Sequence, residues 1–116
     1  GAMFAKFNNL QNLTVIIDNN EMQSDGRSED ILSYKVENVW AGFGWEVITV
    51  KDGNCIAELF DAFSIPRKKG LPRVIIANTV KGKGVSFMEN KKEWHHNSLN
   101  AEQYEAALIE LGKMDN

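Results

Sequence analysis

Cysteine is almost missing from this chain of 116 residues, and its rarity excludes a disulfide-built fold. Cys55 stands alone, so no disulfide can form within the chain. This usage fits the reducing cytoplasm better than a secreted scaffold. Long apolar runs are missing too, since none approaches the roughly 20 residues of a membrane-spanning helix. We therefore expect a cytoplasmic protein with no membrane partner.

An excess of positive charge is also lacking, because the formal net charge is -3. Nucleic-acid binding through phosphates needs clustered Lys and Arg, so nucleic acid is not the expected partner. The one basic cluster, residues 67–69, is interpreted as a solvated loop. The first residues do not form a signal peptide, and Gly1 and Ala2 are interpreted as a cloning scar.

Three short, mostly apolar segments predict the strands of a parallel sheet: residues 13–18, 46–50 and 74–78. Amphipathic helices are predicted between and after them, because apolar residues recur at i, i+3, i+4 and i+7. These positions are Val36, Val39, Trp40 and Phe43; Ile56, Leu59, Phe60 and Phe63; and Tyr104, Ala107, Leu108 and Leu111.

The residues beside these patterns predict where the helices begin and end. Gly44 is expected to stop the first helix, and Asp52 or Asn54 to cap the start of the second. Asn100 is expected to cap the third helix, with Gln103 completing a capping box.

The alternation of strands and helices predicts an α/β fold with three αβα layers and a parallel sheet. Three parallel strands alone leave two apolar edges open, and parallel strands normally lie inside a larger sheet. We therefore expect an incomplete sheet, whose edges favour self-association into a homo-oligomer.

Polar residues follow the first predicted strand, at the edge where ligands bind in open α/β sheets. Asp18 and Asn20 lie there, and the polar residues 21–26 after them are predicted to form a loop. Amide and backbone oxygens suit a hard cation such as Mg²⁺, which holds phosphates beside it. They also suit a simple turn, and the spacing alone favours the turn over the metal site.

Three further features are ambiguous by pattern alone. Lys81–Gly84 combines glycines that allow close backbone approach with lysines that suit phosphate, but such a segment by itself is more often a flexible basic loop. His95 and His96 are adjacent and lack zinc-site spacing, so the pattern favours a polar surface role over catalysis. Cys55 has no base placed beside it by sequence and is interpreted as a packing residue.

Residues 12–26 resemble the transketolase segment that closes the thiamine-diphosphate motif. Residues 75–90 and 93–96 are similar to the next two segments of that family, in the same order, and residues 43–47 match as well. The resemblance runs from about residue 3 to residue 111. It implies that residues 1–116 form a single, partial thiamine-diphosphate-binding domain of the split-transketolase type.

The resemblance implies a site, with thiamine diphosphate and Mg²⁺ as cofactors. Asn20 would ligate the metal through its side chain and Met22 through its backbone carbonyl, and both would thereby bind the cofactor. His95 matches the family histidine that faces the thiazolium and the sugar, which makes it both catalytic and cofactor-binding. The role of His96 is left open. The implied reaction is transfer of a two-carbon ketol unit between sugar phosphates.

The departures from the family pattern matter as well. The Gly-Asp-Gly triplet, whose Asp is a main cation ligand, and the glutamate that activates the aminopyrimidine are absent from this chain. Asn54 and Cys55 stand where relatives often have His and Asp. The chain is therefore expected to be an enzyme fragment, inactive in isolation, that a partner chain with the pyrimidine-binding half would complete. The alternative is a non-catalytic remnant that acts as a binding or scaffold module.

Overall fold

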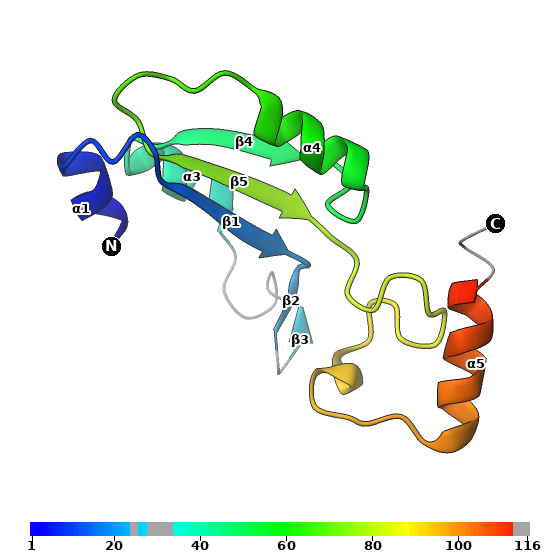
Figure 1. Ribbon diagram of the computed structural model, residues 1–116. Helices are drawn as coiled ribbons and strands as arrows, with labels where there is room; N and C mark the ends of the chain where they lie inside the picture. The colour runs from blue at the N-terminus through cyan, green and yellow to red at the C-terminus, as the bar shows by residue number, and fades with distance from the viewer. Residues whose placement is uncertain (24–25, 28–33, 113–116) are drawn as a thin grey trace. The chain divides into compact units, whose positions relative to one another are not determined.

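The structure is a computed structural model that describes residues 1–23, 26–27 and 34–112. The chain divides into two compact units. Unit 1 comprises Gly1–Asn19 and Leu32–Thr79, and unit 2 comprises Asn20–Ile31 and Val80–Asn116. Unit 1 contains the main sheet, and unit 2 contains a small strand pair and the last helix, as labelled in Figure 1.

The sheet of unit 1 has three parallel strands in the order β1-β5-β4. They are β1 (Thr14–Asn19), β4 (Glu46–Val50) and β5 (Arg73–Asn78), so all three predicted strands form. The central strand β5 is buried from its first residue to Ala77, as expected for an apolar strand covered on both faces. The predicted α/β fold with a parallel sheet is confirmed.

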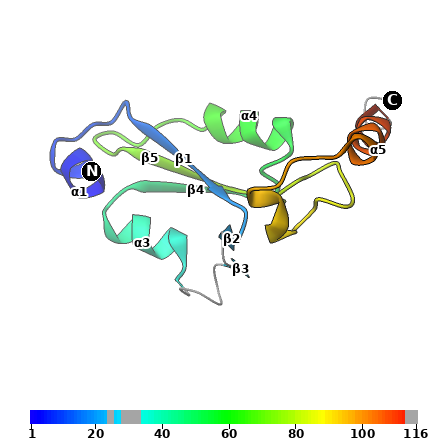
Figure 2. The same cartoon turned by 90° about the horizontal axis from the view of Figure 1, so that it is seen from below.

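Helices cover both faces of this sheet, as Figure 2 shows. One face packs against α1 (Ala2–Phe7) and α3 (Val36–Gly42) around Trp45, Val74 and Ile76. The other face packs against α4 (Ile56–Ser64) around Val50 and Ile75. Alternate residues of β5 thus serve two separate apolar clusters, which gives the predicted three αβα layers.

Of the two predicted helix ends in unit 1, one is confirmed and one is wrong. α3 stops as predicted, because Gly44 adopts a φ of 78° beyond its last turn. The N-cap of α4 is Cys55, which makes no side-chain capping bond, and not Asp52 or Asn54. The Oδ1 atom of Asp52 instead accepts a 3.0 Å hydrogen bond from the backbone N–H of Asn54. A local turn therefore uses the side chain that was expected to cap the helix.

A buried ion pair joins β4 to β5 where the two strands begin. Glu46 and Arg73 are register partners, and the Nε atom of Arg73 donates to the Glu46 Oε2 atom at 2.8 Å. Arg73 also donates to the carbonyl of Pro66 at 3.0 Å. Burial raises the pKa of Glu46, but Arg73 and then Lys68 outweigh it and hold the pKa below its ordinary value of 4.5.

Unit 1 leaves large apolar side chains exposed. Phe7 is 84% exposed, Ile56 83% and Phe60 71%, so α1 and α4 are apolar on their outer faces as well as their inner ones. Exposed apolar patches of this kind commonly mark sites of contact with other protein. Within the described residues the sheet ends at β1 and β4, and neither strand has an outer neighbour.

Unit 2 contains β2 (Met22–Gln23) and β3 (Gly26–Arg27), a short antiparallel pair. The predicted loop over residues 21–26 is therefore wrong in part, and Asp25 lies outside the described residues. A 3-10 helix, η1 (Lys92–His95), and α5 (Ala101–Gly112) follow.

The predicted capping box of α5 is confirmed. The Oδ1 atom of Asn100 accepts from the Gln103 N–H at 2.8 Å, and Gln103 Oε1 accepts from the Asn100 N–H at 3.0 Å. Of the helices in the described ranges, none combines the length and apolar character needed to cross a bilayer.

Candidate functional site

The carboxyl ends of β1 and β5 are tied together by side chains within unit 1. The Nδ2 atom of Asn19 donates to the Oδ1 atom of Asn78 at 2.7 Å. The hydroxyl of Thr79 donates a hydrogen bond to Asp18. The polar residues at this edge therefore hold the two strand ends in register, and Asp18 is already engaged.

Gly53 lies at the same edge of the sheet, where its backbone comes close to the end of β5. Its N–H donates to the carbonyl of Asn78 at 2.7 Å, and the residue is buried. A Cβ atom here would lie 2.8 Å from the Cβ atom of Ala77 and 2.8 Å from the Cγ2 atom of Thr79. Only glycine fits this position without displacing its neighbours.

Asn20 begins unit 2 with a turn built on its own side chain. Its Oδ1 atom accepts a 3.0 Å hydrogen bond from the backbone N–H of Met22, and Glu21 between them has a φ of 56°. The turn that the spacing favoured is therefore present. An amide oxygen has two lone pairs, so this bond leaves one acceptor position on Asn20 Oδ1.

Asn20 and Met22 also line one cavity of about 230 Å³, together with Glu21 and Asn90. The structure thus brings the two predicted metal ligands together and adds two residues that the sequence analysis missed. Asn90 has a φ of 55°, which Asn tolerates better than most residues, and its N–H donates to the Lys81 carbonyl at 2.9 Å. The sequence signals for it were an Asn in a turn-forming segment and its place at the end of the family-like residues 75–90.

The segment that contains Lys81–Gly84 is a run of hydrogen-bonded turns. Gly82 and Gly84 adopt φ values of 73° and 95°, and the Gly84 N–H donates to Glu89 at 3.1 Å. The Lys83 ammonium lies 3.8 Å from the same carboxylate. The segment therefore offers less free positive charge than its sequence indicated.

His95 is the last residue of η1, and its side chain is exposed. Its ring meets the ring of His96 edge to face, with centroids 4.6 Å apart. His95 does not line the cavity of Asn20 and Met22. Within the described residues, no group of three or more His, Cys, Asp or Glu side chains is placed to hold a metal ion.

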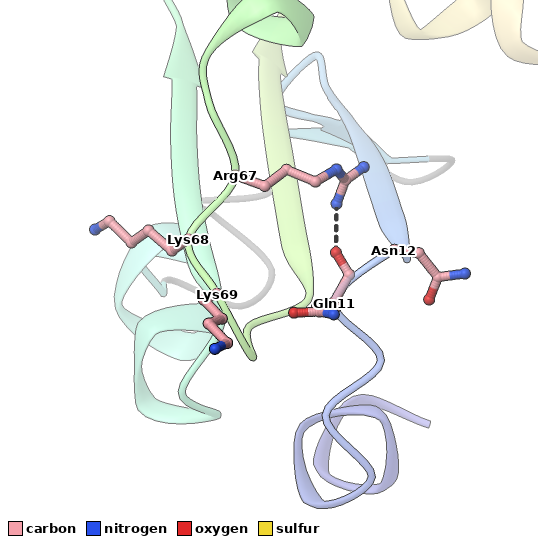
Figure 3. Close-up of a pocket in the computed structure, with 5 residues that line it drawn as sticks. All are labelled: Gln11, Asn12, Arg67, Lys68 and Lys69. Carbon is pink, nitrogen blue, oxygen red and sulfur yellow. Dashed lines mark hydrogen bonds between the residues drawn. The ribbon is translucent and has the colours of Figure 1, made fainter.

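The basic cluster of residues 67–69 lies in unit 1, beside the amino end of β1. With Gln11 and Asn12 it lines a cavity of about 450 Å³, shown in Figure 3. Arg67 reaches toward Gln11 and donates to its carbonyl at 2.9 Å, whereas Lys68 and Lys69 point away. The three cations do not converge, so the cluster does not form an anion site.

One known family matches almost the whole chain. A family model described as "Transketolase, thiamine diphosphate binding domain" matches residues 2–116. The chain belongs to the transketolase family. The resemblance carried by residues 12–26, 75–90 and 93–96 is confirmed.

Curated subunits of split type are among the relatives of this transketolase-family chain. An apulose-4-phosphate transketolase subunit of Phocaeicola vulgatus is 39% identical over 106 residues, which cover 90% of this chain and 37% of that protein. The 6-deoxy-6-sulfo-D-fructose transketolase subunit SqwG of Clostridium sp. strain MSTE9 is 40% identical over 114 residues, or 97% of this chain and 41% of that protein. The chain thus spans well under half the length of these subunits.

A solved transketolase also has the same fold. The crystal structure of transketolase from Campylobacter jejuni subsp. jejuni matches with a TM-score of 0.87 at 25% identity, covering 96% of this chain and 17% of that one.

The oxygen donors of this transketolase-family chain suit a hard cation in kind but not in number. Mg²⁺ requires near-ideal octahedral geometry and is usually held by one or two carboxylates. Asn20 and Met22 offer two neutral oxygens, and Asn20 Oδ1 already accepts the Met22 N–H. Glu21 is the one carboxylate among the residues that line this cavity. The described residues therefore do not complete a cation shell by themselves.

Proposed function

We propose that this chain is the thiamine-diphosphate-binding part of a transketolase-type enzyme that transfers a two-carbon ketol unit between sugar phosphates with Mg²⁺ as its metal. The observation that carries the proposal is the shared cavity of Asn20 and Met22, in a chain that matches the family's cofactor domain over residues 2–116. The bound cofactor would supply the carbon nucleophile of the reaction.

Three residues of the chain would serve this reaction. Asn20 would offer its side-chain oxygen, and Met22 its backbone carbonyl, to the cation that neutralises the diphosphate. His95 would face the thiazolium and the sugar, where an imidazole can donate or accept hydrogen bonds to hydroxyl groups. Its exposed side chain supports this role, because a ring that meets a substrate must be accessible.

The chain in isolation should bind the cofactor weakly and be inactive. Both proposed ligands are neutral, whereas a diphosphate needs its charge balanced by a firmly held cation. The loss of a charged ligand typically costs a few kcal/mol, and each 1.4 kcal/mol is about tenfold in affinity. The isolated chain should therefore bind the cofactor with an affinity that is roughly two orders of magnitude or more below that of a site with the charged ligand in place.

A partner chain would complete the site. Two relatives are named as subunits of an apulose-4-phosphate transketolase, which supports a separate chain carrying the pyrimidine-binding half. The exposed apolar faces of α1 and α4 and the open edges of β1 and β4 support association with further protein, including copies of the same chain.

Calorimetric titration with Mg²⁺ and thiamine diphosphate tests this proposal. We expect no micromolar binding by the chain alone, and both binding and ketol transfer once the Gly-Asp-Gly segment and the partner half are supplied. Asn20→Ala should weaken binding in the completed enzyme, whereas Asn38→Ala, an exposed position on α3, should not. Micromolar binding by the isolated chain would contradict the argument from charge.

A second candidate function is a non-catalytic binding or scaffold module that retains the fold. It is favoured by the donor set, since Asn20 and Met22 are both neutral and the described residues contain no acidic metal cluster. The completed system separates the two candidates. Cofactor binding without transfer, or neither of them, would favour the scaffold, and transfer would exclude it.

A further inference from the structure

The loop after β5 is fastened to the last helix by one carboxylate. The Oε2 atom of Glu110 on α5 accepts from the backbone N–H of Ser86 at 2.5 Å, and its Oε1 atom accepts from the Ser86 hydroxyl at 2.8 Å. Bonds to a carboxylate are shorter and stronger than bonds between neutral groups. Two of them on one residue fix both the position and the orientation of the loop at Ser86.

The residue after Ser86 carries the contact to the histidine segment. Phe87 packs its ring against Trp94 with centroids 5.6 Å apart, and its carbonyl accepts from the Trp94 Nε1–H at 3.0 Å. A ring contact and a hydrogen bond to the same partner define the orientation of the indole. Trp94 lies within η1, and His95 is its last residue.

These contacts form a continuous path inside unit 2 from Glu110 through Ser86, Phe87 and Trp94 to His95. We propose that Glu110 is a positioning residue, which sets the orientation of His95 by holding the loop that anchors Trp94. The link to catalysis rests on the proposed function of His95, whereas the mechanical link rests on the contacts alone.

The link from Ser86 to η1 depends on the hydrogen bond between the Phe87 carbonyl and the Trp94 indole. Phe87 is adjacent to Ser86 in the chain, so a shift of the backbone at Ser86 moves the Phe87 carbonyl directly. The Trp94 indole has a single N–H donor, and that donor is used on this carbonyl. A displaced carbonyl therefore either carries the indole with it or breaks the bond, and both change the surroundings of η1.

Nuclear magnetic resonance of the 116-residue chain tests the path without any cofactor. The variant is Glu110→Ala, and the matched control is Glu105→Ala, an exposed glutamate on the same helix. Three signals are followed at constant pH: hydrogen exchange of the Ser86 amide, the indole N–H of Trp94, and the ring resonances of His95. The indoles of Trp40 and Trp45 lie in unit 1 and report whether that unit stays folded.

We expect Glu110→Ala to speed exchange of the Ser86 amide by about tenfold or more, and to shift the signals of Trp94 and His95. Glu105→Ala should leave all three unchanged. If Glu110→Ala unfolds α5, Ser86→Ala removes only the hydroxyl bond and should give smaller shifts in the same direction, and Ser86→Thr should restore them.

Faster exchange at Ser86 with unmoved signals of Trp94 and His95 would overturn the proposal, because the bond would then be purely local. Equal effects of the two glutamate variants would also overturn it. In the completed enzyme, Glu110→Ala should lower kcat more than it raises the KM of the sugar. Shifts in the isolated chain, together with unchanged ketol transfer by the His95→Ala variant of the completed enzyme, would keep the positioning role and reject the proposed function of His95.

Discussion

The ion pair between Glu46 and Arg73 offers the sharpest test of how the sheet is held together. Arg73→Met removes the cation but keeps most of the aliphatic volume. The substitution leaves the Glu46 carboxylate buried, since Glu46 is only 5% exposed. A buried charge that loses its partner is far more costly than the intact pair was worth.

The size of the effect follows from what remains around Glu46. Breaking a buried pair by removing one partner typically costs about 3–5 kcal/mol. Lys68 still contributes a backbone hydrogen bond and a positive charge to Glu46, so the loss belongs at the lower end, at about 3 kcal/mol. The total stability of a domain of this size is about 5–15 kcal/mol, so the change should be plain in any unfolding curve.

Urea unfolding followed by tryptophan fluorescence measures the change. Trp94 lies in unit 2, so a Trp94→Phe background leaves Trp40 and Trp45 of unit 1 as reporters. Lys69→Met, at a nearby exposed position, is the matched control and should change the free energy of unfolding by less than about 0.5 kcal/mol. The double variant Glu46→Leu/Arg73→Met should lose much less than the sum of its single variants, because no charge is left buried.

Two outcomes would refute this reasoning. Unfolding of Arg73→Met at the same urea concentration as the control would mean that water reaches Glu46. A double variant as unstable as the sum of the single variants would mean that the two side chains contribute separately and not as a pair.

Four further results are expected. The lowered pKa of Glu46 gives stability that is present above about pH 4.5 and is lost as pH falls through the lower folded value, so Glu46→Gln should flatten the acid limb of stability against pH in thermal melts. Gly53→Ala should destabilise unit 1 by about 1–3 kcal/mol in urea, since its Cβ atom would meet backbone and side chains at 2.8–2.9 Å. Its control is Gly42→Ala, where a Cβ atom meets nothing within 4 Å, and this variant should be neutral or stabilising. In the completed enzyme, Asn20→Ala should raise the Mg²⁺ concentration needed for half activity. There, His95→Ala should reduce the rate of ketol transfer more than it weakens cofactor binding measured by calorimetry.

Strand positions were predictable because burial on both faces leaves a plain signature. The segment Val74 to Ala77 is wholly apolar, and it became the buried centre of the sheet. The same signature could not distinguish the central strand from an edge strand. Residues 13–17 are almost as apolar, and yet they lie at an edge of the sheet, where Ile16 is 55% exposed. Which apolar strand takes the centre depends on the partners that it finds, and no local pattern encodes them.

Short polar residues limited the prediction of helix ends. Asp52 and Asn54 both carry a side chain that can cap a helix or bind the neighbouring backbone. At Asn100 the glutamine three residues later decided in favour of the cap. No such reciprocal partner was predicted for Asp52, and the local turn formed instead.

Site residues that are close in sequence were predictable, whereas those contributed by distant segments were not. Asn20 and Met22 lie two residues apart, so a motif could name both. Asn90 enters their cavity from a distant segment, and its approach depends on the turns that close the loop after β5. The bonds that Arg67 makes to the carbonyl of Gln11 and to Thr14 were unpredictable for the same reason, since they join segments more than 50 residues apart in sequence.

The central place of β5 has a consequence for how the chain can fold as it is synthesised. β1 and β4 each pair with β5 and not with each other, and β5 comes last of the three. Its bonds to the neighbours span 59 and 27 positions along the chain, as between Asn19 and Asn78 and between Glu46 and Arg73. Until Asn78 has left the ribosome, the apolar segments of β1 and β4 therefore have no native strand to pair with. A nascent chain arrested before residue 73 should depend on chaperones, and one arrested well beyond residue 79 should depend on them much less.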